Sequence, residues 1–352
     1  MTTPLLRFTG WLLTRAGLLP ILLFLMQGWQ LSLRDRRPAF PFVKRRAERG
    51  FMILGYHRVN DEGDPIFRAV PSRRFVDQMK VLRRYFNVLP LGELVGRAAV
   101  GDIPPKSIAI TFDDGYRDNY ENAFPVLKDL GLPATIFLVT GVMGSSAPIW
   151  HDRAFSILRQ TEVESLHLDG TKYPLGNVEQ RQVALQSILT DLRSLSPQER
   201  NRRLDRLAAD LGVPEPSYGR KLSWAEVREM AENGFTFGAH TVTHPILTKI
   251  PLKDAVREIT RSREAIENQL KQPVTLFAYP NGSPDDFNES IERAVKDAGF
   301  LCAVTTIWGA NNRFSNPFAL RRVGFWGQDA RVAALRLGWY DFCGSAYLDG
   351  PI

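Results

Sequence analysis

Short apolar segments that end abruptly at polar residues alternate with amphipathic stretches through most of this chain. Six of these segments have the length and composition of buried strands, namely residues 51–57, 107–112, 133–139, 235–239, 274–279 and 300–305. Strands that alternate with helices pair in parallel, because each connection crosses over through a helix to a neighbouring strand. The pattern therefore predicts an α/β fold, and in a barrel of this kind the carboxyl ends of the strands carry the chemistry.

Between the strands lie patterns typical of amphipathic helices. Ser72 is the expected N-cap of the first, and apolar side chains follow it at helical spacing, namely Phe75, Met79, Leu82 and Phe86. Ser223 and Glu226 have the spacing of a capping box that opens another helix. Longer helices are expected over 252–270 and 287–298.

A chain of 352 residues has room for one large barrel domain or for two ordinary domains. Apolar residues make up 44% of it and charged residues 24%, so most of the chain should be folded. We divide it into an apolar membrane anchor or interfacial helix over 1–33, a basic linker over 34–50, the barrel domain over 51–325 and a C-terminal helix and tail over 326–352. A polar stretch of helical pattern, from about 145 to 220, is interpreted as an insertion between barrel units.

The N-terminal segment contains a wholly apolar run over 17–25. The run falls short of the roughly 20 residues that a membrane helix needs, and Arg15 and Pro20 interrupt the wider segment. Trp11 and Trp29 flank it like interfacial anchors, and no small-residue cleavage site follows. We therefore expect a retained membrane anchor that spans the bilayer or lies in its interface. A buried helix of a soluble domain is the alternative.

The net charge of +7 is concentrated directly behind this apolar segment. Seven basic residues lie in one short stretch, namely Arg34, Arg36, Arg37, Lys44, Arg45, Arg46 and Arg49. Such a cluster beside an apolar segment is typical of contact with anionic lipid headgroups, so a membrane surface is an expected partner. Nucleic acid is not expected, because no recognition motif accompanies the charge. The two cysteines, Cys302 and Cys343, lack metal-site spacing and cannot form a disulfide framework.

Two adjacent carboxylates, Asp113 and Asp114, follow the apolar strand 107–112 and precede Gly115. Neighbouring side chains of an extended chain point to opposite sides, but the turn that Gly115 allows lets both face one cavity. Two such anions side by side raise each other's cost of ionisation unless a cation lies close by. A bound metal ion would supply that cation. An ordinary turn with solvated charges is the alternative.

His240 and His244 are the only pair among the five histidines with the spacing of metal ligands. Four-residue spacing places two imidazoles on one face of a helical turn, where one divalent ion can bridge them. Two histidines and one carboxylate leave coordination positions open, as in a catalytic rather than a structural site. The combination predicts one divalent metal ion, with zinc first and iron, cobalt or nickel as alternatives. An accidental H-x-x-x-H spacing is the competing interpretation.

The motifs at these strand ends, 111–116 (TFDDGY) and 240–245 (HTVTHP), resemble the first two motifs of the polysaccharide deacetylase family, the NodB-homology or carbohydrate esterase 4 group. The resemblance covers roughly residues 51–325 and implies a distorted (β/α) barrel. The reaction that it implies is hydrolytic N-deacetylation of amino sugars in a polysaccharide or a lipid-linked glycan, with release of acetate.

By the same resemblance, three residues would be metal ligands, namely Asp114, His240 and His244, and Asp113 would be the general base. A divalent ion there would lower the pKa of a water molecule and polarise the acetamide carbonyl. Asp113 would take the water's proton. A backbone N–H near Asn281 would help to hold the oxyanion.

Residues 277–282 (FAYPNG) resemble the third family motif with two departures. Ala278 stands where many members have an arginine that orients the base, and Asn281 replaces an aromatic residue. Residues 56–58 (YHR) resemble an element of a branch that modifies exopolysaccharides, and that branch also tends to read Tyr-Pro-Asn-Gly in the third motif. The departures therefore indicate this branch rather than a loss of activity.

No clear Leu-x-His motif supplies the usual acid histidine late in the chain, so His57 is the expected proton donor. A core histidine bonded to backbone is the alternative interpretation of His57. Arg321 and Arg322 are candidates to orient Asp113 or to bind charge on the substrate, and His151 is expected at the edge of the sugar site. Six residues are expected to bind the glycan, namely Tyr116, Tyr279, Pro280, Asn281, Trp150 and Asp152.

Two rival functions remain at this stage. A non-catalytic glycan-binding protein on the same fold would explain the missing late histidine, but it has no need of a base at Asp113. An Asp-dependent phosphoryl transferase would leave His240 and His244 without a role, and the Asp-x-Asp spacing that it requires is absent.

The expected location is the inner membrane of a bacterium. If the N-terminal segment spans that membrane, the positive charge behind it favours a cytoplasmic barrel domain. A periplasmic domain is the alternative.

Overall fold

The computed structural model describes residues 49–67, 69–213, 219–324 and 329–343. The predicted N-terminal anchor and all of the basic cluster except Arg49 lie outside these residues. Each helix within the described ranges is too short or too polar to cross a membrane. The proposed division into anchor, linker, barrel domain and tail stays a prediction.

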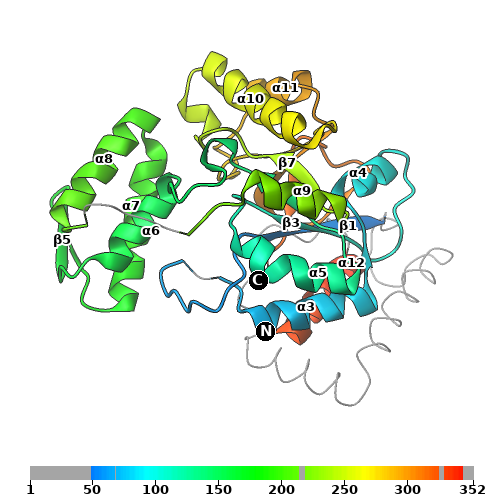
Figure 1. Cartoon of the computed structure of the whole chain (residues 1–352), viewed down its shortest axis with the longest axis horizontal. Helices are drawn as coiled ribbons and strands as arrows, with labels where there is room; N and C mark the ends of the chain where they lie inside the picture. The colour runs from blue at the N-terminus through cyan, green and yellow to red at the C-terminus, as the bar shows by residue number, and fades with distance from the viewer. Residues whose placement is uncertain (1–48, 68, 214–218, 325–328, 344–352) are drawn as a thin grey trace, which may run out of the picture.

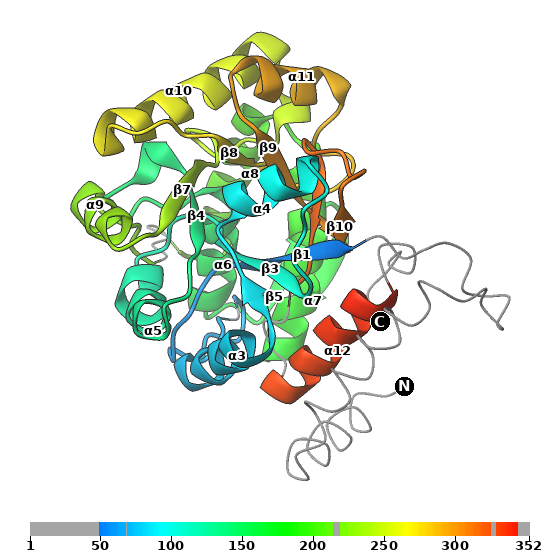
Figure 2. The ribbon, with the colours of Figure 1, turned by 90° about the vertical axis from the view of Figure 1, so that its right-hand side faces the viewer.

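In the described part of the chain, a mainly parallel sheet curls into a nearly closed barrel (Figure 2). The strands of its wall, in spatial order, are β1 (Gly50–Tyr56), β3 (Ser107–Phe112), β4 (Thr135–Leu138), β7 (Thr236–Ala239), β8 (Leu276–Ala278), β9 (Cys302–Trp308) and β11 (Leu320–Arg322). Each neighbouring pair in this series is parallel. A parallel bridge between Leu54 and Val323 then brings the two ends of the series together. The predicted α/β class and the distorted barrel are confirmed.

Several shorter strands were not predicted from the sequence. β2 (Asn87–Val88) pairs with the start of β3, and β10 (Asn311–Asn312) runs antiparallel to the start of β1. β5 (Ser165–Leu168) and β6 (Thr171–Pro174) form a separate hairpin. Strands of two to four residues are too short to show a hydrophobic period, so tertiary pairing alone defines them.

Helices pack around the outside of the barrel (Figure 2). They are α3 (Ser72–Tyr85), a π-helical turn (Asn119–Ala123) that leads into α5 (Phe124–Leu130), α9 (Trp224–Glu232), α10 (Leu252–Leu270), α11 (Glu289–Asp297) and α12 (Ala330–Cys343), with 3-10 turns at Thr140–Val142 and Leu247–Lys249. Along β1, Met52 and Leu54 pack against the outer helices, whereas Phe51 and Ile53 face inward. The inward side chains share a core with α4 (Leu91–Ala99), which covers the amino end of the barrel.

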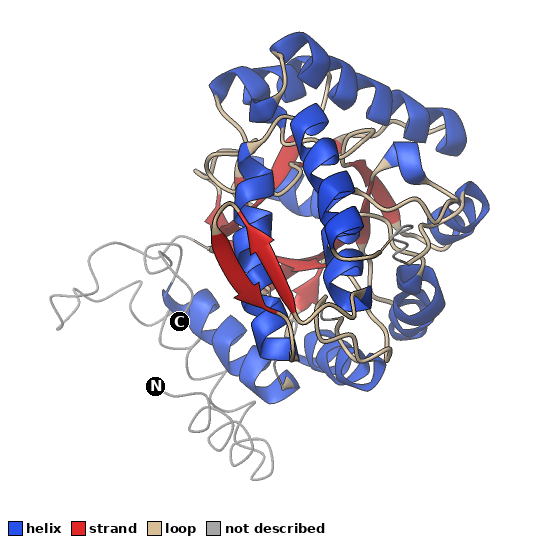
Figure 3. Ribbon diagram, turned by 90° about the vertical axis from the view of Figure 1, so that its left-hand side faces the viewer, coloured by secondary structure: helices blue, strands red, loops and turns tan. Residues whose placement is uncertain are grey.

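The insertion folds beside the barrel as a helical unit with its own core (Figures 1 and 3). It comprises α6 (Trp150–Gln160), the β5–β6 hairpin, α7 (Val178–Ser194) and α8 (Pro197–Asp210). Its core includes Ile157, Ile188 and Leu204. Ile246, which directly follows the histidine motif 240–245, is buried in the same core, and Phe67 from the loop after β1 packs against this core. The insertion therefore contacts two of the loops at the carboxyl rim of the barrel.

The helix start expected at Ser72 has a different cap. Ser72 is the first helical residue, Pro71 holds the N-cap position, and no side-chain cap bond forms there. The Ser72 N–H donates to Asp61 Oδ1 at 2.9 Å, so a loop carboxylate satisfies this helix end. The capping box of Ser223 and Glu226 at α9 is confirmed, with both of its bonds present.

Candidate metal centre

The first acidic motif lies at the carboxyl rim of the barrel, where β3 ends. Asp114 and Gly115 both have left-handed backbone conformations, with φ of 68° and 62°. The positive φ favours glycine at position 115, and a side chain there would also have to displace Leu138 Cδ2, which it would approach to 2.9 Å. The turn leaves the carboxylates of Asp113 and Asp114 buried at the rim.

The histidine motif forms a loop after β7. The prediction that it forms a helical turn is wrong. Thr241 and His244 both have left-handed backbone, with φ of 64° and 58°. Glu258 of α10 accepts hydrogen bonds from the backbone N–H groups of Val242 and Thr243 at 2.7 and 2.9 Å. Thr241 Oγ1 accepts from the His244 N–H at 3.0 Å. These side-chain acceptors replace helical hydrogen bonds, and the loop still brings the two imidazoles together.

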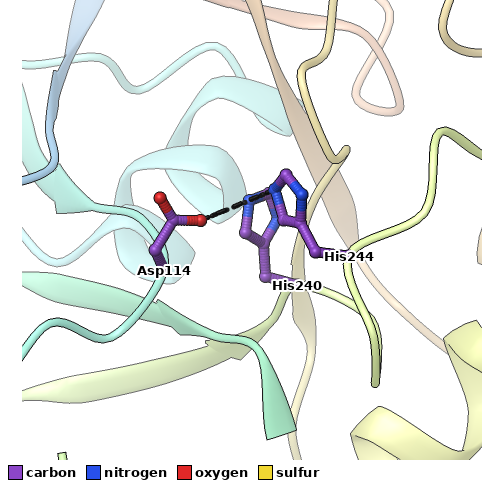
Figure 4. Close-up of side chains that lie close together, drawn as sticks. All are labelled: Asp114, His240 and His244. Atoms are coloured by element: carbon purple, nitrogen blue, oxygen red, sulfur yellow. Dashed lines mark hydrogen bonds and ion pairs between the residues drawn. The ribbon is translucent and has the colours of Figure 1, made fainter. Parts of the chain in front are cut away.

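Three potential ligand atoms from the two motifs converge in Figure 4. His240 Nε2 and His244 Nε2 each lie 3.5 Å from Asp114 Oδ1, and 3.2 Å from each other. The centre of such a triangle lies about 2 Å from each corner, which is the distance at which zinc binds histidine nitrogen and carboxylate oxygen. All three side chains are buried. The geometry and the donor set therefore fit one divalent ion.

The hydrogen bond of His240 fixes which of its ring nitrogens is free to bind a metal ion. Its Nδ1 lies 2.7 Å from the carbonyl oxygen of Ala278. A carbonyl oxygen can only accept, so Nδ1 carries the hydrogen and Nε2 presents its lone pair toward Asp114. Ala278 thus orients a candidate ligand through its backbone carbonyl.

Three polar atoms of the triad have no hydrogen-bond partner among the described residues. These are both carboxylate oxygens of Asp114 and Nδ1 of His244. Burial alone would raise the pKa of Asp114, but His151 and His244 outweigh it and hold that pKa well below its usual range. Burial, reinforced by His240, holds the pKa of His244 well below its usual range. A buried carboxylate with no hydrogen bond beside neutral imidazoles is the donor set that a cation stabilises.

Asp113 faces a different partner. Arg322, from β11, donates two hydrogen bonds to it, from Nη1 to Oδ1 and from Nη2 to Oδ2, both at 2.7 Å. Arg322 Nε also donates to the Thr305 carbonyl at 2.7 Å, which fixes the guanidinium. Burial would raise the pKa of Asp113, but Arg322 outweighs it and keeps that pKa below its usual range. Of the two candidate arginines, Arg322 therefore orients the carboxylate, whereas Arg321 lies 3.5 Å from the Trp308 carbonyl.

His57 lies at the edge of this pair. Its Nε2 is 3.8 Å from Asp113 Oδ2, and about a third of its side chain (32%) is exposed. A partly exposed imidazole beside the carboxylate is placed for proton exchange with a substrate. The role of His57 as proton donor stays a prediction.

The residues expected to bind the glycan are mostly buried. The buried side chains are those of Tyr116, Trp150, Asp152, Tyr279 and Pro280, and only Asn281 is half-exposed. Tyr116 donates to Asp152 Oδ1 at 2.5 Å, and Tyr279 donates to the Phe318 carbonyl at 2.9 Å. With their polar ends already paired, these two tyrosines are placed to support the site from behind. Their direct contact with the glycan stays a prediction.

Two residues of this region were not singled out from the sequence. Lys221 is fully buried and its Nζ lies 3.1 Å from Asp152 Oδ2. Glu258 supports the histidine loop from α10. Nothing in the local sequence marks either residue, because their partners are separated from them by 69 and about 15 positions.

Replacing Glu258 with alanine is expected to weaken zinc binding by roughly 10- to 100-fold, as is typical when a partner that orients ligands is lost. The change removes the acceptor that holds the backbone of the loop between His240 and His244. Competition with a colorimetric chelator measures the affinity. Glu264→Ala, an exposed position on the same helix, is the matched control. Equal affinities for the two variants would contradict the role given to Glu258.

Comparisons with known proteins indicate the family of this chain. A family model described as polysaccharide deacetylase matches residues 101–303, more than half of the chain. The polysaccharide deacetylase-like protein YxkH of Bacillus subtilis is 24% identical over 273 residues, which cover 77% of this chain and 70% of YxkH. The poly-β-1,6-N-acetyl-D-glucosamine N-deacetylase of Staphylococcus epidermidis is 34% identical over 110 residues, which cover 27% of this chain and 38% of that enzyme.

Solved structures show the same fold. The Streptococcus pyogenes deacetylase PplD superimposes with a TM-score of 0.58 at 19% identity, covering 82% of this chain and 97% of that chain. IcaB from Ammonifex degensii gives a TM-score of 0.56, also at 19% identity, with the same coverage of the two chains.

Proposed function

This chain belongs to the polysaccharide deacetylase family and is a hydrolase of carbon–nitrogen bonds in N-acetylated glycans, and we propose that it acts through one divalent metal ion held by Asp114, His240 and His244. The observation that carries this proposal is the triangle of one carboxylate oxygen and two imidazole nitrogens beside a second carboxylate, Asp113. Zinc fits the donor set and the distances, and iron, cobalt or nickel would fit the same ligands.

A divalent ion at this position would lower the pKa of a water molecule and polarise the acetamide carbonyl. The protein's own contribution begins with Asp113, the general base, which takes the proton of the attacking water. Arg322 occupies one site on each oxygen of Asp113, and each oxygen has a second lone pair with which to accept a proton. The guanidinium also keeps the carboxylate ionised, so the base is ready at neutral pH.

The second proton transfer is assigned to His57. Collapse of the tetrahedral species needs a proton on the amine nitrogen of the sugar. His57 Nε2 lies 3.8 Å from Asp113 Oδ2, and the imidazole is partly exposed to solvent. The products are acetate and an amino sugar, which carries a positive charge at neutral pH.

The proposed substrate is a polymer of N-acetylglucosamine of the exopolysaccharide kind. The staphylococcal relative is named for poly-β-1,6-N-acetyl-D-glucosamine, and residues 56–58 and 277–282 have the pattern of the exopolysaccharide branch. A lipid-linked glycan is the second candidate. The apolar run 17–25 and the basic cluster behind it favour that candidate, and they support a bacterial inner membrane surface as a partner. Protease accessibility in intact cells and in spheroplasts would show on which side of the membrane the barrel lies.

Phe67 is expected to contact a sugar ring. Its half-buried ring lies 6.5 Å from the rings of both His57 and His151, and it stacks on Phe155 at 4.4 Å. Replacing it with alanine should raise KM for an N-acetylated oligosaccharide about fivefold, because a single ring contact is worth roughly 1 kcal/mol. We expect kcat to fall as well, because Phe67 also packs on Phe155 of the helix that carries His151. Steady-state kinetics measure both constants. Phe314→Ala, at an exposed phenylalanine beyond β10, is the control, and an unchanged KM at Phe67 would contradict the contact.

The proposed activity is tested with soluble β-1,6-linked oligomers of N-acetylglucosamine. We expect acetate and free amine to form in equal amounts, and a chelator to stop both. A glycan-binding protein without activity would retain the oligomer on a column while releasing no acetate. That outcome, obtained with zinc present, would contradict the proposal.

A further inference from the structure

The insertion reaches the metal centre through a single imidazole. His151 lies in the first turn of α6, and its Nε2 is 3.5 Å from Asp114 Oδ2 and 3.6 Å from Asp152 Oδ1. The two candidate ligands, His240 and His244, face the other oxygen of Asp114, Oδ1. Each oxygen of this carboxylate therefore has its own imidazole neighbours, and the rings of His151 and His244 lie side by side with their centres 5.0 Å apart.

We propose that His151 is a positioning residue that holds the Asp114 carboxylate so that Oδ1 points at the metal ion, and that the insertion completes the metal centre by supplying it. This inference rests on the proposed function. The structure has a 3.5 Å contact at Oδ2 and no hydrogen bond, but an N–H of His151 directed at this oxygen would attract it and oppose rotation of the carboxyl group about its bond to Cβ. A ligand that is held in the binding geometry loses less entropy when the metal ion binds.

His151 is in turn held by a buried cluster. Asp152 accepts from the Tyr116 hydroxyl at 2.5 Å and from Lys221 Nζ at 3.1 Å, and Asp152 and Lys221 are both fully buried. Lys221 Nζ also lies over the Tyr116 ring, 3.4 Å from its centre. The positive charge of Lys221 compensates the negative charge of Asp152, so the cluster presents a fixed carboxylate oxygen to His151 without adding net charge. The Nε2 atom of His151 thus faces two carboxylates, Asp152 from the insertion and Asp114 from the barrel.

The insertion is fastened to the barrel around this contact. Phe155, one turn along α6 from His151, stacks on Phe67 at 4.4 Å. Arg193 at the end of α7 donates to Asp286 Oδ2 and to Ser283 Oγ, at 2.8 and 2.7 Å, in the loop after β8. These contacts fix the insertion against two rim loops, one through α6 and one through α7, so the position of His151 is set by tertiary packing and not by the short sequence around it.

The test measures zinc affinity, by chelator competition, in wild type and in variants of position 151. His151→Ala should bind one zinc ion roughly 10- to 100-fold more weakly than wild type, the usual cost of losing a partner of a metal ligand. His151→Gln keeps an N–H that reaches Oδ2, and it should restore the affinity to within about threefold of wild type. The control is His167→Ala, at an exposed histidine of β5 in the same insertion, which should bind zinc as wild type does. Thermal melts followed by circular dichroism confirm that each variant is folded.

The outcomes separate this inference from the proposed function. If wild type binds zinc and His151→Ala binds it equally well, the positioning role is overturned while the metal site stands. If alanine and glutamine at 151 weaken zinc binding equally, the N–H is not what matters and the inference is again overturned. If wild type itself binds no divalent ion, the proposed function fails first.

Discussion

Replacing Asp113 with asparagine is expected to lower kcat for acetate release by roughly 100- to 10,000-fold, the range that a positioned general base contributes. The amide keeps the shape of the side chain and one acceptor oxygen for Arg322, but it cannot take a proton from water. Zinc affinity should stay within about threefold of wild type, because Asp113 is not one of the three converging groups. Steady-state kinetics and chelator competition on the same preparation measure both quantities.

Asp118→Asn is the matched control for this variant. Asp118 is also a buried carboxylate paired with an arginine, at 2.8 Å from Arg58 Nε, and it lies five positions further along the chain. Its loss should affect stability without a comparable loss of kcat. A kcat for Asp113→Asn within tenfold of wild type would show that another group is the base.

Removing Arg322 should have the largest effect on stability. Arg322→Met leaves Asp113 buried without its counter-charge, and breaking such a pair costs about 3–5 kcal/mol of unfolding free energy. The double variant Arg322→Met with Asp113→Asn should recover most of that loss, because it no longer buries an unpaired charge. Denaturant unfolding of the two single variants, the double variant and wild type measures the coupling.

Arg321→Met serves as the control, since Arg321 is the preceding residue of β11 and is only half-buried. We expect it to unfold close to wild type. If Arg322→Met is as stable as Arg321→Met, the buried ion pair is not what holds the base in place.

The fold and the chemical centre could be predicted because their signals are local. Each long strand carries its own apolar run, and the polar residues stand where those runs stop, as at Asp113 and His240. Residues at the carboxyl ends of parallel strands meet at one rim, so the convergence of the two motifs was expected from parallel pairing together with the ligand spacing and the family resemblance. The conformation of the histidine loop could not be predicted, because Glu258 of α10 supplies the acceptors that a helical turn would have provided.

The partners of the site lie too far along the chain for a local pattern to identify them. Arg322 is 209 positions from Asp113. Neighbouring side chains of a strand point to opposite faces, so the register of β11 in the barrel decides which of the two adjacent arginines faces inward. His151 was expected beside the sugar, which stays a prediction, and its contact with Asp114 could not be foreseen because the packing of α6 on Phe67 sets its position. Asp152, expected to bind glycan, is buried against Lys221 for the same reason.

A zinc titration of metal-free wild-type protein, with acetate release followed at each point, tests most directly whether Asp114, His240 and His244 share one catalytic ion. We predict no acetate release before zinc is added, a linear rise to one equivalent and no further rise beyond it. His244→Ala should show no such restoration at these concentrations. Acetate release at the full rate from the metal-free protein, or an equal response from His244→Ala, would contradict this account.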